Sequence, residues 1–207
     1  MRSYFVTGIG TGVGKTLVSA VLTEALNADY WKPVQTGPLE DGDRARVKHL
    51  VSNSKTTYFE EAYWFKEPTS PHLAAFLENS RIHETQINLP ASQNRFMVIE
   101  GAGGLLVPLN DGFFVIDLAK RFGAEVILVC RSYLGCINHS LLSIDYLIKN
   151  GFQLKGLVLN GKFDPLLRST LQNYANTPIL AELDELSDLN KESVRQLART
   201  INLEPFA

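Results

Sequence analysis

The residues best suited to chemistry lie near the start of the chain, in residues 8–16, which read GIGTGVGKT. Four of these nine residues are glycine, so backbone N–H groups can converge there on one anion. Lys15 and Thr16 close the segment. In a phosphate-binding loop, a lysine at this place reaches the β- and γ-phosphates, and the hydroxyl after it binds Mg²⁺. The segment therefore predicts a nucleoside triphosphate site.

The glycine spacing departs from the common phosphate-loop pattern, which has four residues between its first glycine and Gly-Lys-Thr. That pattern requires glycine where this chain has Ile9, whereas Gly8 stands one residue earlier. Gly10 and Gly12 fill the loop. The alternative is a glycine-rich turn with an incidental Lys-Thr pair. A strand pattern before the glycines and a helix pattern after them favour the triphosphate site, with ATP preferred because the sequence has no N-K-x-D motif for guanine.

Three further charged residues are candidates for the same site. Lys32 begins KPVQTG (32–37) at the end of a predicted strand and would add a second cation. Glu100 ends the apolar run of VIEGAGG (98–104), and together with Asp43 it would supply oxygen ligands to a metal ion. Each has a plainer alternative. Lys32 could be a solvated lysine, Glu100 a structural carboxylate and Asp43 a helix cap.

Short apolar runs alternate with amphipathic stretches, and this alternation predicts the elements that position these residues. The predicted strands span residues 4–8, 29–37, 96–104, 125–130 and 155–161, of which the second breaks into a loop at Pro33 and the third ends in a glycine loop. The predicted helices span residues 15–27, 41–53, 115–123, 137–151 and 190–202. Residues 54–95 are the least regular part of the chain.

Buried strands that alternate with helices imply parallel pairing through right-handed crossovers. The predicted fold class is therefore α/β, of P-loop NTPase type, with a mostly parallel central sheet and helices on both faces. The length of 207 residues suits one domain over residues 1–207, and the hydrophobic fraction of 45% allows a packed core.

Charge and cysteine content limit the partners and the compartment. The net charge is −2, and the longest basic run is the pair at 120–121, so nothing argues for a nucleic-acid or membrane surface. The two cysteines, Cys130 and Cys136, indicate a reduced, cytoplasmic protein. We expect no signal peptide and no transmembrane segment, because no apolar run is long enough.

Five segments, taken in order, resemble one known family. They read VTGIGTGVGKT, WKPVQTG, EPTSPH, EGAGGLLVPL and LGCINHSLLS. This set resembles dethiobiotin synthetase, whose loop has the same extra residue before Gly-Lys-Thr. The resemblance implies an ATP-dependent ligase with Mg²⁺ as cofactor. Such an enzyme joins 7,8-diaminononanoate and CO₂ through a carbamate and a carbamic-phosphoric anhydride, and releases dethiobiotin, ADP and phosphate.

The resemblance also implies roles for single residues. The expected catalytic residues are Lys15 and Lys32, which match phosphate-side cations, and Thr11, which matches a threonine that contacts substrate and phosphate. Thr36 matches a hydroxyl residue that binds the carbamate, and Asn160 matches the asparagine that reads the adenine edge. The expected metal ligands are Thr16, Asp43 and Glu100. The expected ATP-binding residues are Gly12, Val13, Gly14, Lys15, Thr16, Leu17, Asp43, Glu100, Gly101, Ala102, Gly103, Asn160, Gly161, Asp184 and Leu186.

The LGCIN segment implies an oligomer. In the family, this loop reaches across a dimer interface to hold the far end of the diamine. The resemblance therefore implies a homodimer with shared active sites. The expected substrate-binding residues are Thr36, Leu134, Gly135, Cys136 and Asn138.

Two other classes fit part of the pattern. A partition or septum-site ATPase switch has a similar loop and sheet, but it carries a signature lysine where this chain has TGIGTG. Such switches also often end in a basic membrane helix, whereas this chain ends RQLARTINLEPFA. Another amide-forming ligase of the same superfamily is the second alternative. Cys136 has a separate alternative as a nucleophile, for which no histidine–acid partner is evident.

Overall fold

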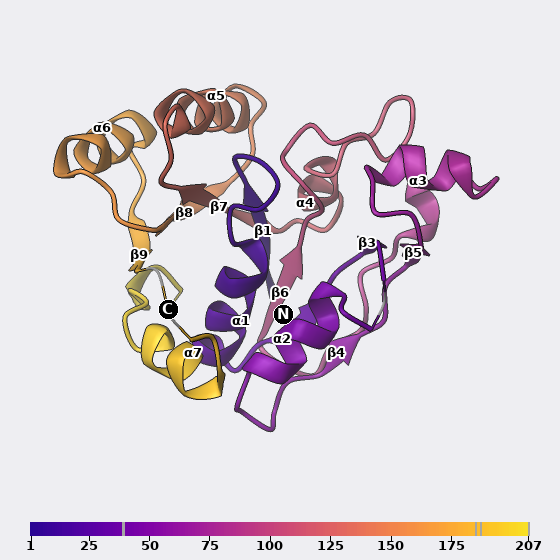
Figure 1. Ribbon diagram of the computed structural model, residues 1–207, viewed down its shortest axis with the longest axis horizontal. Helices are drawn as coiled ribbons and strands as arrows, with labels where there is room; N and C mark the ends of the chain where they lie inside the picture. The colour runs from indigo at the N-terminus through magenta and orange to yellow at the C-terminus, as the bar shows by residue number, and fades with distance from the viewer. Residues whose placement is uncertain (39, 185, 187, 207) are drawn as a thin grey trace.

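Seven strands form the central sheet of the computed structural model, which describes residues 1–38, 40–184, 186 and 188–206 (Figure 1). In order across the sheet, they are β4 (Tyr58–Phe59), β2 (Asp29–Trp31), β6 (Phe96–Glu100), β1 (Arg2–Gly8), β7 (Glu125–Arg131), β8 (Leu154–Asn160) and β9 (Ile179–Leu183). Every neighbouring pair in this sheet is parallel. The carboxyl ends of the strands therefore meet at one edge, where ligands bind in such sheets.

Helices cover both faces of this sheet, because successive strand residues point to opposite sides. Tyr4 and Val6 of β1 share a hydrophobic cluster with residues of α1 (Lys15–Leu26), α2 (Asp43–Leu50) and α7 (Lys191–Ala198). Phe5 belongs to the opposite cluster, with residues of α4 (Asp117–Arg121), α5 (Cys136–Lys149) and α6 (Pro165–Ala175). The predicted α/β fold with a parallel sheet and helices on both faces is confirmed, and the single domain stays a prediction. Within the described residues, no helix is both long and apolar enough to cross a membrane.

The segment 29–37 differs from its prediction. β2 ends at Trp31, and after Pro33 the chain forms a second strand, β3 (Val34–Thr36), instead of a loop. β3 leaves the central sheet and pairs in parallel with β5 (Tyr63–Phe65). Pro33 has no N–H with which to continue the first ladder. Its carbonyl instead accepts hydrogen bonds from the N–H groups of Ala62 and Tyr63, at 2.9 and 3.1 Å.

The least regular region of the sequence, residues 54–95, contains short elements. They are β4, β5, helix α3 (Pro71–Leu77) and the 3₁₀ turn η1 (Glu84–Gln86). The sequence prediction also missed α6, β9 and the 3₁₀ turn η2 (Glu204–Phe206). For α6 a signal was present, because Pro165 opens the helix and Asp164 caps it by accepting from the N–H of Leu166 at 2.8 Å.

A buried carboxylate fixes the start of β2. Asp29 is 1% exposed and accepts hydrogen bonds from the N–H of Thr57 at 2.7 Å and from the amide of Asn94 at 2.6 Å. The hydroxyl of Ser92 is a third donor. These contacts tie β2 to the segments that precede β4 and β6. They therefore hold in place the strand that leads into Lys32.

The variant Asp29→Ala should lower the free energy of unfolding by about 2–4 kcal/mol, because three hydrogen-bond donors lose a carboxylate acceptor that is itself buried. Urea denaturation followed by circular dichroism measures this loss. Asp111→Ala is the control, because the Asp111 carboxylate is 93% exposed and pairs with Arg81 at the surface. An exposed ion pair contributes little. Equal effects of the two changes would contradict the structural role of Asp29.

Candidate active site

The phosphate loop, residues 9–14, joins β1 to α1 at the carboxyl edge of the sheet. Gly14 caps α1 with φ of 96°, a left-handed conformation that glycine adopts without strain. A Cβ atom there would lie 2.1 Å from Nδ2 of Asn160, so a larger residue does not fit. The first N–H groups of α1 have no partner within the helix, and with the helix dipole they favour an anion at this place.

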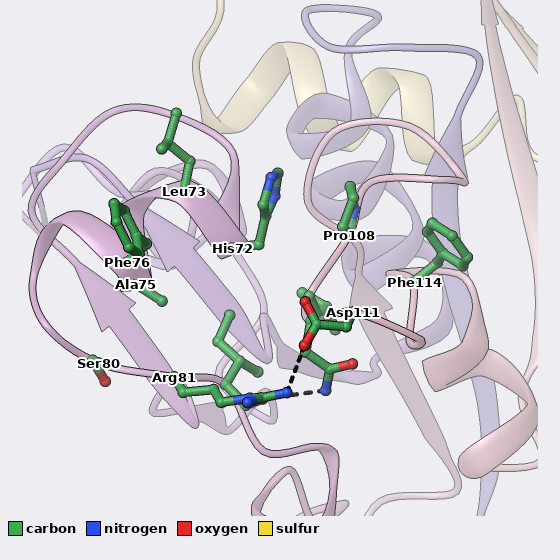
Figure 2. A pocket seen from close by; sticks show the side chains of 12 residues that line it. His72, Leu73, Ala75, Phe76, Ser80, Arg81, Pro108, Asp111 and Phe114 are labelled. Carbon is green, nitrogen blue, oxygen red and sulfur yellow. Dashed lines mark hydrogen bonds and ion pairs between the residues drawn. The ribbon is translucent and has the colours of Figure 1, made fainter.

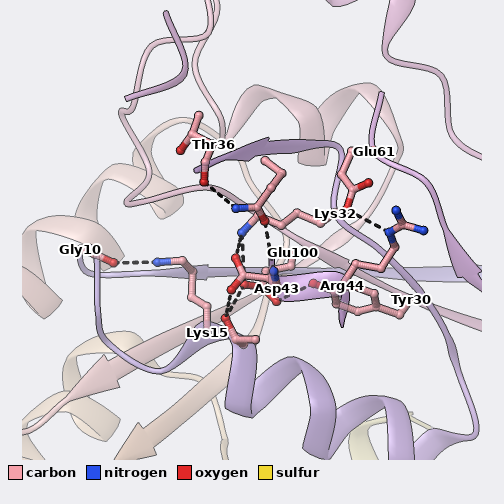
Figure 3. A network of polar contacts seen from close by, with 11 residues as sticks. Gly10, Lys15, Tyr30, Lys32, Thr36, Asp43, Arg44, Glu61 and Glu100 are labelled. Carbon is pink, nitrogen blue, oxygen red and sulfur yellow. Dashed lines mark hydrogen bonds and ion pairs between the residues drawn. The ribbon is translucent and has the colours of Figure 1, made fainter. Parts of the chain in front are cut away.

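Lys15 is the first residue of α1, and its side chain turns back towards the loop (Figure 3). Its Nζ donates to the carbonyl oxygen of Gly10 at 2.8 Å. Burial lowers the pKa of Lys15 to about 8, although the carboxylate of Glu100 opposes this shift. A phosphate that replaced the Gly10 carbonyl would give this buried cation a charged partner.

Three oxygen-bearing side chains meet beside the loop, and we call them the Thr16 cluster: Thr16, Asp43 and Glu100. Oγ1 of Thr16 lies 2.8 Å from Oδ1 of Asp43 and 3.0 Å from Oε1 of Glu100. A hydroxyl and two carboxylates are hard oxygen donors of the kind that Mg²⁺ prefers, with phosphate oxygens and water completing its shell. The chemistry of these residues therefore fits the expected metal.

The structure also separates Asp43 from its helix-cap alternative. Asp43 is the first residue of α2, and Gly42 holds the capping position. The Asp43 carboxylate bonds to Thr16 and Lys32, so it faces the site. Burial opposes the charge of Asp43, but the ammonium of Lys32 outweighs this effect and lowers the pKa of that carboxyl.

Lys32 is the cation of this cluster. It is 5% exposed, so it is not the solvated lysine of the alternative reading. Its Nζ bonds to Oδ2 of Asp43 and lies 3.4 Å from Oε1 of Glu100. Burial opposes its charge, but the carboxylates of Glu100 and Asp43 outweigh burial and raise the pKa of Lys32. Lys32 therefore stays charged at the point where β2 ends.

These residues line one cavity of about 470 Å³, which we call the Lys32 cavity. It contains the three predicted catalytic residues, the predicted carbamate residue Thr36 and the Thr16 cluster. The turn at Pro33 brings Thr36 there, on β3. Gln35 links the parts, because its Nε2 donates to the carbonyl of Thr36 at 2.6 Å and its Oε1 accepts from the N–H of Asp43 at 3.2 Å. The full lining is Thr11, Gly12, Gly14, Lys15, Thr16, Lys32, Gln35, Thr36, Asp43, Arg46, Glu100, Ala102 and Gly103.

A second cavity of about 400 Å³ begins on the other side of the loop, and we call it the Asn160 cavity. It shares Gly12 and Gly14 with the first cavity, so one extended molecule could occupy both. Nδ2 of Asn160 donates to the carbonyl of Val13 at 2.8 Å. The lining is Gly12, Gly14, Leu17, Arg131, Asn160, Gly161, Asp184, Leu186 and Leu189.

Two predicted ATP-binding residues have packing roles in the structure. The side chain of Val13 is buried against the core, and only its carbonyl faces Asn160. Gly101 lies against the ring of Phe5, where a Cβ atom would come within 3.0 Å of Cε1. In contrast, Ala102 and Gly103 line the Lys32 cavity directly.

The predicted substrate loop lies apart from these cavities. Leu134, Gly135, Cys136 and Asn138 line neither of them among the described residues. Leu134 and Asn138 are exposed, whereas the side chain of Cys136 is 1% exposed. Gly135 has φ of 95° and allows the sharp turn from β7 into α5.

A larger cavity of about 580 Å³ lies between α3 and the segment 108–114 (Figure 2). None of its lining residues is a predicted site residue, although His72 comes from the EPTSPH segment. Figure 2 shows the ion pair between Arg81 and Asp111 at one end, which spans 2.8 Å. Its remaining walls are mostly apolar, so it offers no comparable place for a triphosphate.

Comparison with known proteins identifies the family. A family model described as AAA domain matches residues 2–193. The ATP-dependent dethiobiotin synthetase BioD of Christiangramia forsetii is 42% identical over 95% of this chain and 94% of its own length. The protein of the same name from Cytophaga hutchinsonii is 43% identical over 96% of both chains. The chain belongs to the dethiobiotin synthetase family.

Solved structures of other proteins share the fold of this dethiobiotin synthetase family member. The septum site-determining protein MinD of Pyrococcus horikoshii, complexed with Mg-ADP, superposes with a TM-score of 0.56 at 15% identity and covers 95% of this chain and 94% of its own. A ParA family ATPase from Chlorobium tepidum gives 0.54 at 12% identity and covers 100% and 98%. At such identities only the fold is shared. The sequence relatives therefore decide against the partition or septum-site alternative.

Sequence reasoning missed four residues that line the two cavities. Gln35 and Arg46 line the Lys32 cavity, and Arg131 and Leu189 line the Asn160 cavity. Arg131 had a signal, because it is a cation at the end of the apolar strand 125–130, and its guanidinium donates to the carbonyl of Gly12 at 2.8 Å. The others depend on tertiary packing that no local pattern reveals.

Neither cysteine should react in the folded protein. Cys130 is 0% and Cys136 is 1% exposed, and burial raises the pKa of Cys130 to about 12. We expect both thiols to resist a thiol-specific disulfide reagent at mildly alkaline pH until guanidinium unfolds the chain. Asp111→Cys is the positive control, because it adds an exposed thiol that should react at once. Rapid modification of native Cys136 would revive the nucleophile alternative.

Proposed function

We propose that this protein makes dethiobiotin from 7,8-diaminononanoate, CO₂ and ATP. One observation carries the proposal: Lys15 and Lys32 line the same cavity as Thr36, beside the Thr16 cluster. Two cations in one cavity suit a reaction in which both a carbamate and a triphosphate are negative. The relatives named ATP-dependent dethiobiotin synthetase support the choice of substrate.

The proposed reaction has three steps. One amine of the substrate adds to CO₂ through a new N–C bond and releases a proton, which gives a carbamate. A carbamate oxygen attacks the γ-phosphorus of ATP, and the bond from that phosphorus to ADP breaks, which gives the carbamic-phosphoric anhydride. The second amine attacks the carbonyl carbon, expels phosphate, loses a proton and closes the cyclic urea.

In this proposal, positioning and cationic support dominate the catalysis, as they do in phosphoryl transfer generally. Lys15 holds the phosphates from the side of the loop, and Thr11 lies on the same loop. Lys32 and Thr36, on either side of the turn at Pro33, hold the carbamate. Mg²⁺ at the Thr16 cluster would neutralise charge on the β- and γ-phosphate oxygens. The base of ATP extends into the Asn160 cavity.

We also propose that two copies of the chain share their active sites. An apolar groove of about 250 Å³ lies beside the substrate loop, with Leu106 and Leu142 on its walls. These leucines are 50% and 61% exposed, and Leu134 is fully exposed. A second copy would cover such surface. The N-terminus of α5 suits the far carboxylate of the diamine, because the first N–H groups of a helix have no partner within the helix.

The compartment and the domain count complete the proposal. Cys130 and Cys136 are unpaired, which suits the reducing environment of the cytoplasm. Both hydrophobic clusters pack on one sheet. This packing supports a single domain over residues 1–207. The proposed substrates of this domain are small molecules.

Protein with Mg²⁺, ATP, bicarbonate and 7,8-diaminononanoate should yield dethiobiotin, ADP and phosphate, as detected by mass spectrometry. Lys32→Met should lower kcat/KM by about 10²–10³, because one charged donor to the reacting groups is lost. Calorimetry should show that this variant still binds ADP, because the phosphate loop and Lys15 are unchanged. Phosphate release that ignores the diamine and yields no cyclic urea would refute the assignment and favour an ATPase switch.

Complementation tests the shared site. Lys15→Ala and Asn138→Ala should each be inactive, because one removes a phosphate contact and the other a contact to the diamine. After subunit exchange, a mixed dimer has one site with both defects and one with neither, so part of the activity should return. Leu142→Asp should give the mass of a monomer in solution. No recovery after confirmed exchange, or a monomeric wild-type protein, would exclude the shared site.

A further inference from the structure

A buried tyrosine of β2, Tyr30, contacts the Thr16 cluster through the carboxylate of Glu100. Tyr30 is 0% exposed, and its hydroxyl donates to Oε2 of Glu100 at 2.9 Å (Figure 3). The other oxygen of this carboxylate, Oε1, accepts from Thr16 at 3.0 Å and lies 3.4 Å from Lys32. The two oxygens of Glu100 thus have separate partners, and only Oε1 belongs to the side that would meet a metal ion.

The register of the sheet explains how Tyr30 reaches this place. Tyr30 pairs with Val98 on the neighbouring strand β6. Val98 and Glu100 are two residues apart and therefore point to the same face of the sheet. The long tyrosine side chain extends along that face towards the carboxyl edge. Lys32 follows two residues after Tyr30, so one segment supplies partners to both oxygens of Glu100.

We propose that Tyr30 is a positioning residue for the metal–nucleotide complex, because it fixes Glu100 with Oε1 towards the ion. This inference rests on the proposed metal site. It assigns a role in metal binding to Tyr30, which lies outside the phosphate-loop motif. Some residues bind the second polar atom of a metal ligand and so hold that ligand in place. Their mutation commonly lowers the affinity for the metal by about 10–100-fold.

The surroundings of Tyr30 suit this task. The hydroxyl is fully buried among side chains of the hydrophobic cluster under α1, and Oε2 of Glu100 is its hydrogen-bond acceptor. A phenol O–H is a hydrogen-bond donor that suits a carboxylate oxygen. A carboxylate turns easily about its last side-chain bond. The hydrogen bond from Tyr30 to Oε2 restricts this rotation before the ion arrives, and it does so from the side opposite to Thr16 and Lys32.

The plainer alternative is that Tyr30 only fills the core. Its ring belongs to the hydrophobic cluster under α1, and it lies 6.4 Å from the ring of Tyr58. Tyr30→Phe separates the two roles, because phenylalanine keeps the ring and loses only the hydroxyl. Tyr58→Phe is the matched control, since Tyr58 sits on the adjacent strand and its hydroxyl bonds to Thr56, outside the site.

The test measures metal and nucleotide binding without turnover. Mn²⁺ is the probe, and electron paramagnetic resonance reports its affinity for the protein in complex with ADP. Tyr30→Phe should weaken Mn²⁺ binding about 10–100-fold. Calorimetry in a chelator should give an ADP affinity within about twofold of wild type, since Lys15 and the loop are intact. Tyr58→Phe should match wild type in both measurements.

A second variant shows whether Tyr30 acts through Glu100. In the background of Glu100→Gln, the added change Tyr30→Phe should have little further effect on Mn²⁺ affinity. A full additional loss in that background would overturn the proposal. If Glu100→Gln weakens Mn²⁺ binding but Tyr30→Phe does not, the role of Tyr30 is refuted and the metal site stands. If neither variant weakens it, the metal site and this inference both fail.

Discussion

The rest of the site depends on the burial of charge at the carboxyl edge of the sheet. Glu100 and Lys32 are 1% and 5% exposed, so each must be satisfied by protein groups. Thr16 comes from α1, Tyr30 and Lys32 from the segment of β2, and Asp43 from α2. A shift of any one of these elements would leave a buried charge without its partner, which is strongly destabilising. The same contacts thus fix both the fold at this edge and the geometry of the site.

The phosphate loop is likewise held by contacts from neighbouring segments. Asn160, at the end of β8, donates to the carbonyl of Val13 in the phosphate loop. Arg131, at the end of β7, donates to the carbonyl of Gly12. Gly104 packs against the same loop, where a Cβ atom on this residue would lie 3.6 Å from Cα of Gly10. The ends of β7 and β8 and the segment after β6 therefore contact the loop before any nucleotide arrives. Such preorganisation reduces the free energy that binding must spend on ordering.

Sequence reasoning recovered the features that local pattern encodes. The glycine loop between β1 and α1, the alternation of strands and helices, and the places of Lys32 and Glu100 at strand ends all follow from residue type and order. It failed where long-range contacts decide. Pro33 was expected to end a strand in a loop, but Ala62 and Tyr63 bind its carbonyl and guide the chain into β3. The contact of Tyr30 could not be predicted, because its partner Glu100 lies 70 residues away in the sequence. Only the folded sheet places β6, which carries Glu100, beside β2.

The fold relatives sharpen the argument about function. Parallel sheets of this kind also occur in MinD and ParA proteins, so the fold alone does not select a reaction. In this chain the chemistry that suits the proposed reaction lies in the segment after β2. Lys32 is charged and buried, and four residues later β3 presents Thr36 to the same cavity. In the proposed reaction, the loop and the Thr16 cluster bind the triphosphate, whereas the carbamate that attacks its γ-phosphorus needs a second anion site opposite it. In the proposed reaction, Lys32 and Thr36 form that second site, because the turn at Pro33 brings both to the cavity that also holds Lys15.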